Sequence, residues 1–348
     1  MKKLLIAQLF WFYSSVWAAG CPVYIPDLSL YYGNGMFNEP EEASDSVRKL
    51  QRLMNGQLLY HDVSYKISYN HNENPIEQIL EVARQKLLQD YSSILLWLSG
   101  IDEAPDWFQE ALEDTVAGYQ AFSYIFDGDL QRHVADYTQD ITSCRKVLLV
   151  AHSQGNFYGN EAWRYVYQNT VDNLPFSRLK LMGMVSVATP SSQLGEPLAY
   201  EEDLAAITRY LTLTDDLVIN VLRSYNFGPL PANLTNNTES DDWKNHSFSG
   251  TYLFGSPSRG VLQSQIREVA YSLETLPFAR QGLDSSALAS AGYDPAAQIL
   301  EVEFASSGSV YRYYDVPDNI YRGLISADSV GGFYNLSIRG QYPSRRLY

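Results

Sequence analysis

The sequence predicts an α/β protein with a mostly parallel sheet and helices on both faces, followed by a small C-terminal α+β domain. Apolar segments of strand length alternate with helical patterns as far as residue 276, which is typical of βαβ units. One of these segments, residues 147–151, is apolar throughout, as in a strand buried on both faces. Farther on, the segments become short and alternating. The chain has 348 residues, 45% of them hydrophobic, and is long enough for both parts.

The elements expected for the larger part follow one another along the chain. Each expected strand is apolar or alternating, and each expected helix has apolar or small residues at helical spacing. The expected strands are 27–32, 63–69, 147–151, 179–188 and 210–214. The expected helices are 40–54, 75–98, 107–124, 129–137, 156–168, 217–223 and 260–276. Together they predict one domain over residues 27–276.

Residues 1–20 have the pattern of a secretory signal peptide. Lys2 and Lys3 precede the apolar stretch 4–17, and small residues follow it. No later stretch is apolar enough for us to expect a membrane span. We therefore expect an exported protein, located in the periplasm or cell envelope or secreted.

Cys21 has three alternative states. The preceding Ala-Ala-Gly resembles the lipobox of bacterial lipoproteins, which implies lipidation of Cys21 and attachment to a membrane. Cys144 is the only other cysteine, and two cysteines in an exported protein can pair. The sequence leaves open whether Cys21 is lipidated, disulfide-bonded or free.

The charge of the chain excludes some classes of partner. A formal net charge of −15 and a pI of about 4.7 disfavour nucleic acids and anionic membrane surfaces. An ester or lipid substrate that enters an apolar cleft is compatible with this charge. No metal-ligand cluster, phosphate-binding loop or dinucleotide fingerprint is evident in the sequence, so no metal and no cofactor are expected.

The segment from Ala151 to Gly155 carries the candidate nucleophile. The apolar strand stops at His152, and a helical pattern begins after Gly155. Ser153 is then expected on a sharp strand-to-helix turn, where small residues on either side let the strand and helix pass closely. This is the pattern of a nucleophile elbow, and the backbone N–H of Gln154 is the expected oxyanion donor.

Candidate partners of Ser153 follow in the order acid, then base. Asp215 and Asp216 come directly after the expected strand 210–214, at the edge where parallel sheets hold their sites. The pattern Asp-x-Val-Ile favours Asp216, with Asp215 as the alternative, and an aspartate here could also cap the helix that follows. His246 is the one histidine of five that comes after both the serine and the acid.

A glycine-rich loop after the first strand supplies a second oxyanion candidate. Gly33 and Gly35 flank Asn34 and let the backbone approach a substrate oxygen. The backbone N–H of Met36 is the expected donor.

Residues 27–276 resemble the α/β-hydrolase superfamily, specifically its lipase- and esterase-like members. The resemblance depends on the Ala151–Gly155 motif, the loop 33–36, and the order of Asp216 and His246. It implies hydrolysis of a carboxylic ester by a Ser-His-Asp triad. Two other functions stay open: transfer of the acyl group to an alcohol or lipid, and non-catalytic binding in the envelope on the same scaffold.

Residues 284–346 look like a KTSC domain, a small module found at the C-terminus of some lysyl-tRNA synthetases and in short bacterial proteins. Its elements are expected to be strands at 299–304, 310–314 and 333–339 and a helix at 319–327, after a linker at 277–283. The resemblance implies no activity and identifies no protein partner. The matching residues include Gly292-Tyr293-Asp294-Pro295, Leu300-x-Val302-x-Phe304, Tyr311-x-Tyr313, Val316-Pro317 and Tyr334-Asn335.

Overall fold

The computed structural model describes residues 21, 27–34, 40–59, 61–70, 105–110, 128–171, 174–224 and 228–348. The expected signal peptide, Met36, the expected helix 75–98 and most of the expected helix 107–124 lie outside these residues. The chain divides into two compact units, which are described separately. The larger consists of Ile25–Asn169 and Phe176–Leu276, and the smaller of Met1–Tyr24, Thr170–Pro175 and Pro277–Tyr348.

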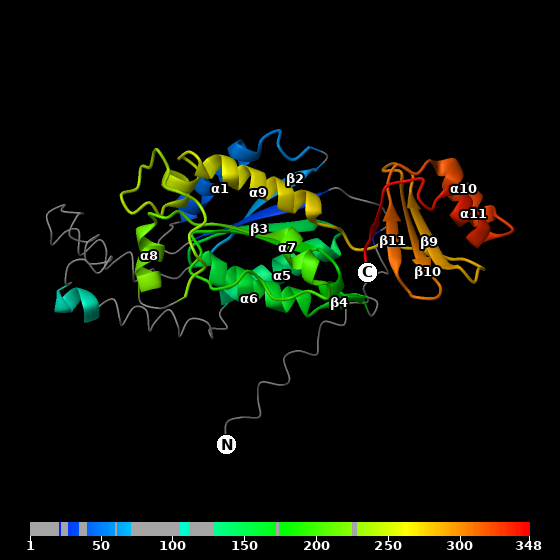
Figure 1. Ribbon diagram of the computed structural model, residues 1–348, viewed down its shortest axis with the longest axis horizontal. Coiled ribbons are helices and arrows are strands. Elements are labelled where there is room, and N and C mark those ends of the chain that lie inside the picture. Colours follow the sequence, from blue (N-terminus) through cyan, green and yellow to red (C-terminus); the bar gives the residue numbers. More distant parts are fainter. Residues whose placement is uncertain are drawn as a thin grey trace, which may run out of the picture. The chain divides into compact units, whose positions relative to one another are not determined.

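The larger unit contains a five-stranded parallel sheet with β3 at its centre (Figure 1). Every residue of β3 is buried, as the uninterrupted apolar run predicts. Gly33, Ala151 and Ser186 pair across neighbouring strands, so β1, β3 and β6 end at the same edge of the sheet. The strands, in sheet order, are β2 Val63–Ser68, β1 Leu28–Gly33, β3 Lys146–His152, β6 Met182–Val187 and β7 Thr208–Leu211.

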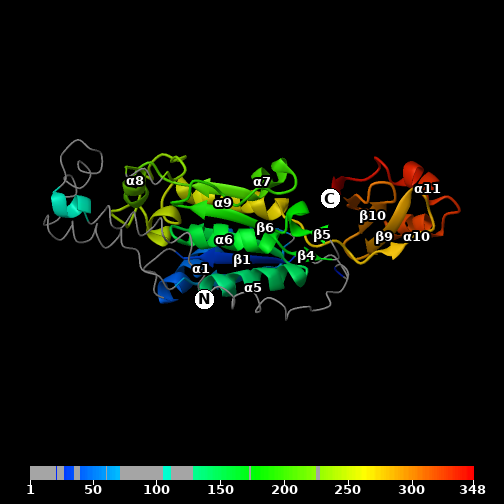
Figure 2. The ribbon, with the colours of Figure 1, turned by 90° about the horizontal axis from the view of Figure 1, so that it is seen from below.

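Helices cover both faces of this sheet, as expected. Figure 1 shows α1 and α9 on one side of the sheet, and α5 and α6 on the other. Figures 1 and 2 show α5 and α6 side by side. Among the described residues, the helices with defined bounds are α1 Pro40–Met54, α5 Gly128–Thr142, α6 Gly155–Tyr167, α7 Glu201–Ile207, α8 Leu217–Ser224 and α9 Ser258–Ser272, with a π-helical turn η2 at Phe248–Tyr252 and a 3₁₀ turn η1 at Phe176–Arg178.

Local sequence explains how two of these helices form. Helix α1 begins at Pro40, whose missing N–H costs nothing at this position, and Glu41 and Glu42 in its first turn favour the positive end of the helix dipole. Helix α9 buries Leu262, Ile266 and Val269 at helical spacing. This apolar stripe holds α9 on strands β6 and β7 of the sheet.

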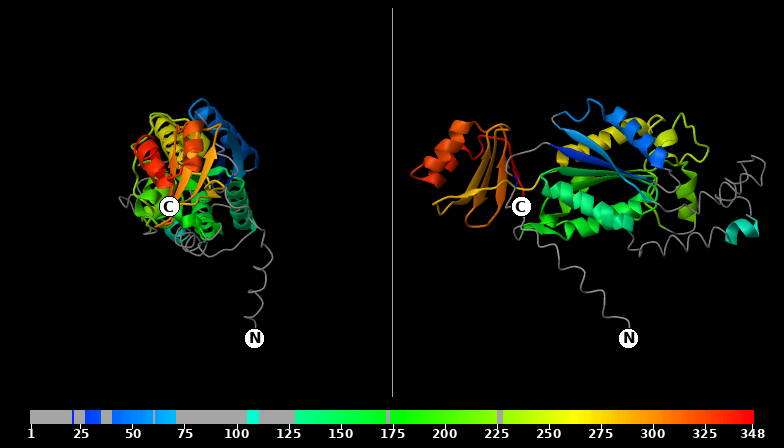
Figure 3. Two further views of the ribbon diagram at one scale, coloured as in Figure 1. Left: turned by 90° about the vertical axis from the view of Figure 1, so that its right-hand side faces the viewer. Right: turned by 180° about the vertical axis from the view of Figure 1, so that it is seen from behind.

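The smaller unit contains a five-stranded antiparallel sheet, with the two helices of residues 277–348 on one face (Figure 3). The sheet order is β12 Ser344–Arg346, β11 Val310–Tyr313, β10 Ile299–Phe304, β9 Leu288–Asp294 and β8 Gln281–Gly282. The helices are α10 Asp318–Ser326 and α11 Val330–Ser337. The short strands β4 Thr170–Val171 and β5 Leu174–Pro175 pair with each other.

Two expectations for this unit differ from the structure. Residues 333–339 were expected as a strand, but 330–337 form helix α11. Ser329 caps this helix by accepting a hydrogen bond from the N–H of Gly332 at 3.2 Å, and Tyr334 is buried in the core. Residues 277–283, expected as a linker, belong to the unit: strand β8 lies among them, and the N–H of Phe278 donates to Glu301 at 2.7 Å.

Both cysteines, Cys21 and Cys144, are disulfide-bonded, and neither is a free thiol. This arrangement corresponds to the disulfide among the three alternatives for Cys21. A sulfur already held in a disulfide has no valence left for a lipid thioether. Within the ranges given above, no helix combines the length and the apolarity that crossing a bilayer requires.

Candidate active site

Ser153 stands on a tight turn between β3 and α6. Its φ is +52°, a left-handed conformation that non-glycine residues seldom adopt. Its N–H donates to the carbonyl of Val187 on the neighbouring strand at 3.0 Å. The backbone strain expected for an elbow is therefore present, and Ser153 lies at the carboxyl edge of the sheet.

Gly155 allows the end of β1 to lie against this turn. A Cβ atom on Gly155 would lie 2.6 Å from the carbonyl oxygen of Gly33 and 2.8 Å from that of Asn34. Asn34 is in turn held to Asn70 after β2: the N–H of Asn70 donates to Asn34 Oδ1 at 2.8 Å, and Asn70 Nδ2 donates to the Asn34 carbonyl at 2.9 Å. The glycine-rich loop thus begins beside Ser153.

Three predicted residues form a continuous hydrogen-bond chain, which we call the Ser–His–Asp relay. His246 Nε2 lies 2.9 Å from Ser153 Oγ, and His246 Nδ1 lies 2.9 Å and 3.0 Å from the two carboxylate oxygens of Asp216. All three residues are buried. Because a carboxylate only accepts, Nδ1 carries the hydrogen, and Nε2 is left to accept from the serine hydroxyl.

The backbone of His246 is fixed by a turn around Asp242. Asp242 Oδ2 accepts the N–H of His246 at 2.9 Å and that of Ser247 at 2.7 Å. Asn245, directly before the histidine, has a φ of +52°, which asparagine tolerates better than most residues. This local turn brings a loop histidine to the serine from 93 residues away.

Asp216 both caps a helix and contacts His246. Its Oδ1 accepts the N–H of Ile219 at 3.1 Å, and its Oδ2 accepts the hydroxyl of Tyr252 at 2.8 Å. The alternative acid, Asp215, instead accepts Asn245 Nδ2 at 2.9 Å, and burial raises the pKa of its carboxyl. Of the two candidate acids, the structure brings Asp216 to the histidine.

Sequence reasoning missed two side chains around the relay. Tyr252, in the π-helical turn after His246, donates to Asp216 and accepts the N–H of Leu213 at 3.1 Å. His152 Nε2 lies 2.7 Å from the backbone carbonyl of His246. The sequence carries a weak signal for each, because a buried tyrosine usually needs a partner and a histidine ending a buried strand must find one.

Gln154 is the N-cap residue of α6 and is almost completely buried, at 1% exposure. Within the part of the chain that the structure describes, its backbone N–H donates to no other group and its side-chain amide has no partner. The N-terminus of a helix favours negative charge, so this N–H is suited to an oxyanion. Met36, the other expected donor, lies outside the described residues.

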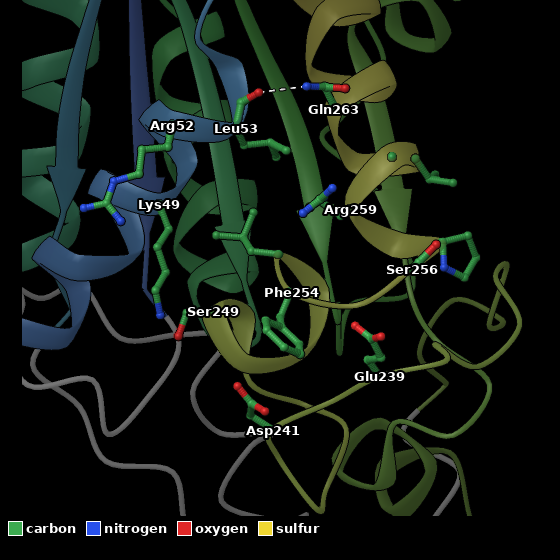
Figure 4. Close-up of a pocket in the computed structure, with 14 residues that line it drawn as sticks. Lys49, Arg52, Leu53, Glu239, Asp241, Ser249, Phe254, Ser256, Arg259 and Gln263 are labelled. Atoms are coloured by element: carbon green, nitrogen blue, oxygen red, sulfur yellow. Dashed lines mark hydrogen bonds between the residues drawn. The ribbon is translucent and has the colours of Figure 1, made fainter.

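A separate cavity of about 1000 Å³ lies between α1 and α9. Figure 4 shows Lys49 of α1 and Arg259 of α9 on its walls, with Glu239 and Asp241 on a facing loop. Gln263 Nε2 donates to the carbonyl of Leu53 at 2.8 Å beside it. No residue of the Ser–His–Asp relay lines this cavity. Across the described ranges, no group of His, Cys, Asp and Glu side chains is arranged to hold a metal ion.

Fold and site together define an α/β protein with a buried Ser–His–Asp relay at the carboxyl edge of its parallel sheet and a separate antiparallel module. The chain belongs to the KTSC family through that module: the KTSC domain model matches residues 284–342. The resemblance noted in the sequence is thereby confirmed for this segment.

Two curated proteins and one solved structure are similar to this module. A protein of Stutzerimonas stutzeri, described as uncharacterized, is 51% identical over 63 residues, 18% of this chain and 87% of its own. A protein of Tsukamurella paurometabola is 42% identical over 67 residues, 19% of this chain and 98% of its own. The crystal structure of a KTSC domain protein from Yersinia pestis is 36% identical, covers 20% of this chain and 97% of its own, and has a TM-score of 0.20.

Proposed function

We propose that the larger unit is a serine hydrolase of the α/β-hydrolase superfamily that cleaves a carboxylic ester. The observation that carries the proposal is the buried relay, in which Ser153, His246 and Asp216 are joined by hydrogen bonds of 2.9 Å. The left-handed φ of Ser153 and its place at the end of a central parallel strand support it further.

In the proposed mechanism, His246 Nε2 takes the hydroxyl proton as Ser153 Oγ attacks the ester carbonyl. Asp216 holds the imidazole by Nδ1 and stabilises its protonated form. The tetrahedral intermediate then collapses, His246 gives the proton to the leaving alcohol, and the acyl group stays on Ser153. A water molecule, deprotonated by His246, attacks the acyl-enzyme, and collapse releases the acid and restores Ser153.

The backbone N–H of Gln154 stabilises the oxyanion in this mechanism, and that of Met36 serves as the second donor. A donor of this kind lowers the barrier by about 3–4 kcal/mol. The proposed substrate is a lipid or a small acyl ester, and the proposed place of action is outside the cytoplasm. Disulfide bonding of both cysteines supports the location, because disulfides persist in oxidising compartments.

The test is hydrolysis of p-nitrophenyl acetate and butyrate by wild type, Ser153→Ala and Ser186→Ala. Ser186 is a matched control: it is buried on the neighbouring strand β6, and its hydroxyl has no partner among the described residues. We expect loss of hydrolysis in Ser153→Ala alone. We also expect a fluorophosphonate to label Ser153 in wild type, as mapped by mass spectrometry.

Equal hydrolysis by wild type and Ser153→Ala would overturn the proposal. Folded wild-type protein that neither hydrolyses esters nor takes the label would instead support a binding protein on this scaffold. Product analysis with added alcohol separates hydrolysis from acyl transfer, because a transferase would form a new ester.

A further inference from the structure

We propose that His152, the residue before the candidate nucleophile, positions His246 by donating a hydrogen bond to the backbone carbonyl of His246. This inference rests on the proposed function, since it assigns a support to the base of that mechanism. It begins from one contact: His152 Nε2 lies 2.7 Å from the carbonyl oxygen of His246, and both residues are buried.

The contact completes the attachment of the His246 backbone. On one side, Asp242 Oδ2 accepts the N–H of His246 at 2.9 Å. On the other side, His152 binds the carbonyl of the same residue. The imidazole of His246 is therefore carried by a segment held at both of its peptide groups, once from its own turn and once from the central strand β3.

Ring packing fixes the orientation of His152. Its ring centroid lies 4.9 Å from that of His246 and 5.6 Å from that of Phe248. The ring centroid of Tyr252, whose hydroxyl donates to Asp216, lies 6.3 Å from that of His152. A ring enclosed in this way has little freedom to release the carbonyl, so the alignment of His246 with Ser153 depends on β3 itself.

The protonation state of His152 follows from its partner. A carbonyl oxygen only accepts, so Nε2 carries a hydrogen. Nδ1 has no partner in the described part of the chain. Burial, and then the neighbouring His246, lower the pKa of His152 well below its usual 6.5. His152 accordingly stays neutral near pH 7 and acts as a positioning residue, with no proton transfer of its own.

The chain offers a matched control in His133. It is equally buried, at 4% exposure, and its Nε2 lies 3.2 Å from the carbonyl of Tyr69. His133 belongs to α5 and takes no part in the relay. Replacing either histidine therefore removes the same kind of bond, but only one of the two bonds holds His246.

The experiment measures kcat and KM for p-nitrophenyl butyrate in the full chain with His152→Leu, His152→Gln, His133→Leu and His133→Gln. Thermal unfolding checks that each variant is folded. We expect His152→Leu to lower kcat by about 10- to 100-fold with little change in KM, because small misplacements of a catalytic group have effects of this size. The amide of His152→Gln can donate to the same carbonyl and should recover most of kcat. Both His133 variants should keep the wild-type kcat.

Folded His152→Leu with wild-type kcat would overturn the inference, as would a folded His152→Gln impaired as strongly as His152→Leu. If His152→Leu does not fold, His152→Asn replaces it, since the shorter amide is polar but does not reach the carbonyl. Failure of the proposed function looks different: wild type itself would then show neither hydrolysis nor labelling of Ser153.

Discussion

Asp215 and Asp216 are neighbours in the chain, yet their carboxylates serve different partners. Asp216 accepts from His246, Ile219 and Tyr252, whereas Asp215 accepts from Asn245. The acid of the proposed mechanism is therefore decided by which of two adjacent side chains turns toward the imidazole.

We expect Asp216→Asn to lower kcat by about 10²–10⁴-fold, because an amide cannot hold the imidazole in the required tautomer or stabilise its charge. The matched control, Asp215→Asn, should stay within a few-fold of wild type. Steady-state hydrolysis of p-nitrophenyl butyrate measures both. A larger loss of kcat in the Asp215 variant than in the Asp216 variant would contradict the assignment of Asp216 as the acid of the proposed mechanism.

Tyr252→Phe tests the support of Asp216. The change removes the hydroxyl that donates to Asp216 and accepts from Leu213, so we expect a loss of about 1–3 kcal/mol in unfolding free energy and a lower kcat. Tyr167 donates to the carbonyl of Met182 and accepts the N–H of the same residue, and among the described residues it makes no hydrogen bond to the relay. Tyr167→Phe should lose similar stability and keep kcat. Equal kcat values in the two variants would argue against a role of Tyr252 in supporting Asp216.

At the scale of elements, the turn between β3 and α6 depends on the close approach of β1. The carbonyls of Gly33 and Asn34 occupy the space that a side chain at Gly155 would need. The contact joins the end of the first strand of the sheet to the first helical turn after Ser153.

We expect Gly155→Ala to destabilise the protein by about 1–3 kcal/mol, because the added Cβ meets backbone atoms that cannot move without shifting β1. Gly260, in the first turn of α9, is the control, since a Cβ there has nothing within 4 Å. Gly260→Ala should raise the free energy of unfolding by about 0.5–1 kcal/mol, because alanine has a higher helix propensity than glycine. Urea unfolding measures both variants. We expect their changes in unfolding free energy to have opposite signs.

At the scale of the whole molecule, the two units have separate cores. In the smaller unit, Glu301 and Arg312 are fully buried. Arg312 Nε donates to Glu301 Oε1 at 2.9 Å, and the N–H of Phe278 donates to Glu301 Oε2. This pair fastens residues 277–282 to the sheet of the KTSC domain.

Glu301→Gln should destabilise the smaller unit by about 3–5 kcal/mol, because it removes the carboxylate charge that is paired with the buried Arg312 guanidinium. Glu303→Gln, two residues along β10 and partly exposed, should change the stability by less than about 1 kcal/mol. Calorimetry follows the unfolding transitions, and ester hydrolysis is measured in parallel. Loss of hydrolysis in folded Glu301→Gln would show that the two units depend on each other.

The stability of the molecule should also depend on pH through His61. Burial, and then the positive charge of Lys146, lower the pKa of His61 from 6.5 to about 4. Below pH 6.5 the unfolded chain binds a proton at His61 that the folded chain refuses until about pH 4, so this residue costs stability as the pH falls through that window. The free energy of unfolding of His61→Gln, measured by urea unfolding, should therefore rise relative to that of wild type as the pH falls from 7 to 4.5. A difference in unfolding free energy that does not change with pH would contradict the expectation.

Much of the fold follows from local sequence. The apolar run before Ser153, the small residues around it and the amphipathic stripe of α9 are encoded within a few positions, and the parallel sheet with helices on both faces appears as expected. Residues 333–339 show the limit of such patterns. Their composition favours a strand, but the Ser329 cap and packing of Tyr334 into the core produce helix α11.

By itself the sequence determined the strand–turn–helix at Ser153, the order of Ser153, the Asp215–Asp216 pair and His246, and the KTSC module, because each depends on neighbouring residues or on order along the chain. Only the tertiary structure decided for Asp216 over Asp215 and revealed the supports Tyr252 and His152. Those choices depend on hydrogen bonds between residues 30 to 94 positions apart, and a buried polar group takes whichever partner the packed chain brings within reach.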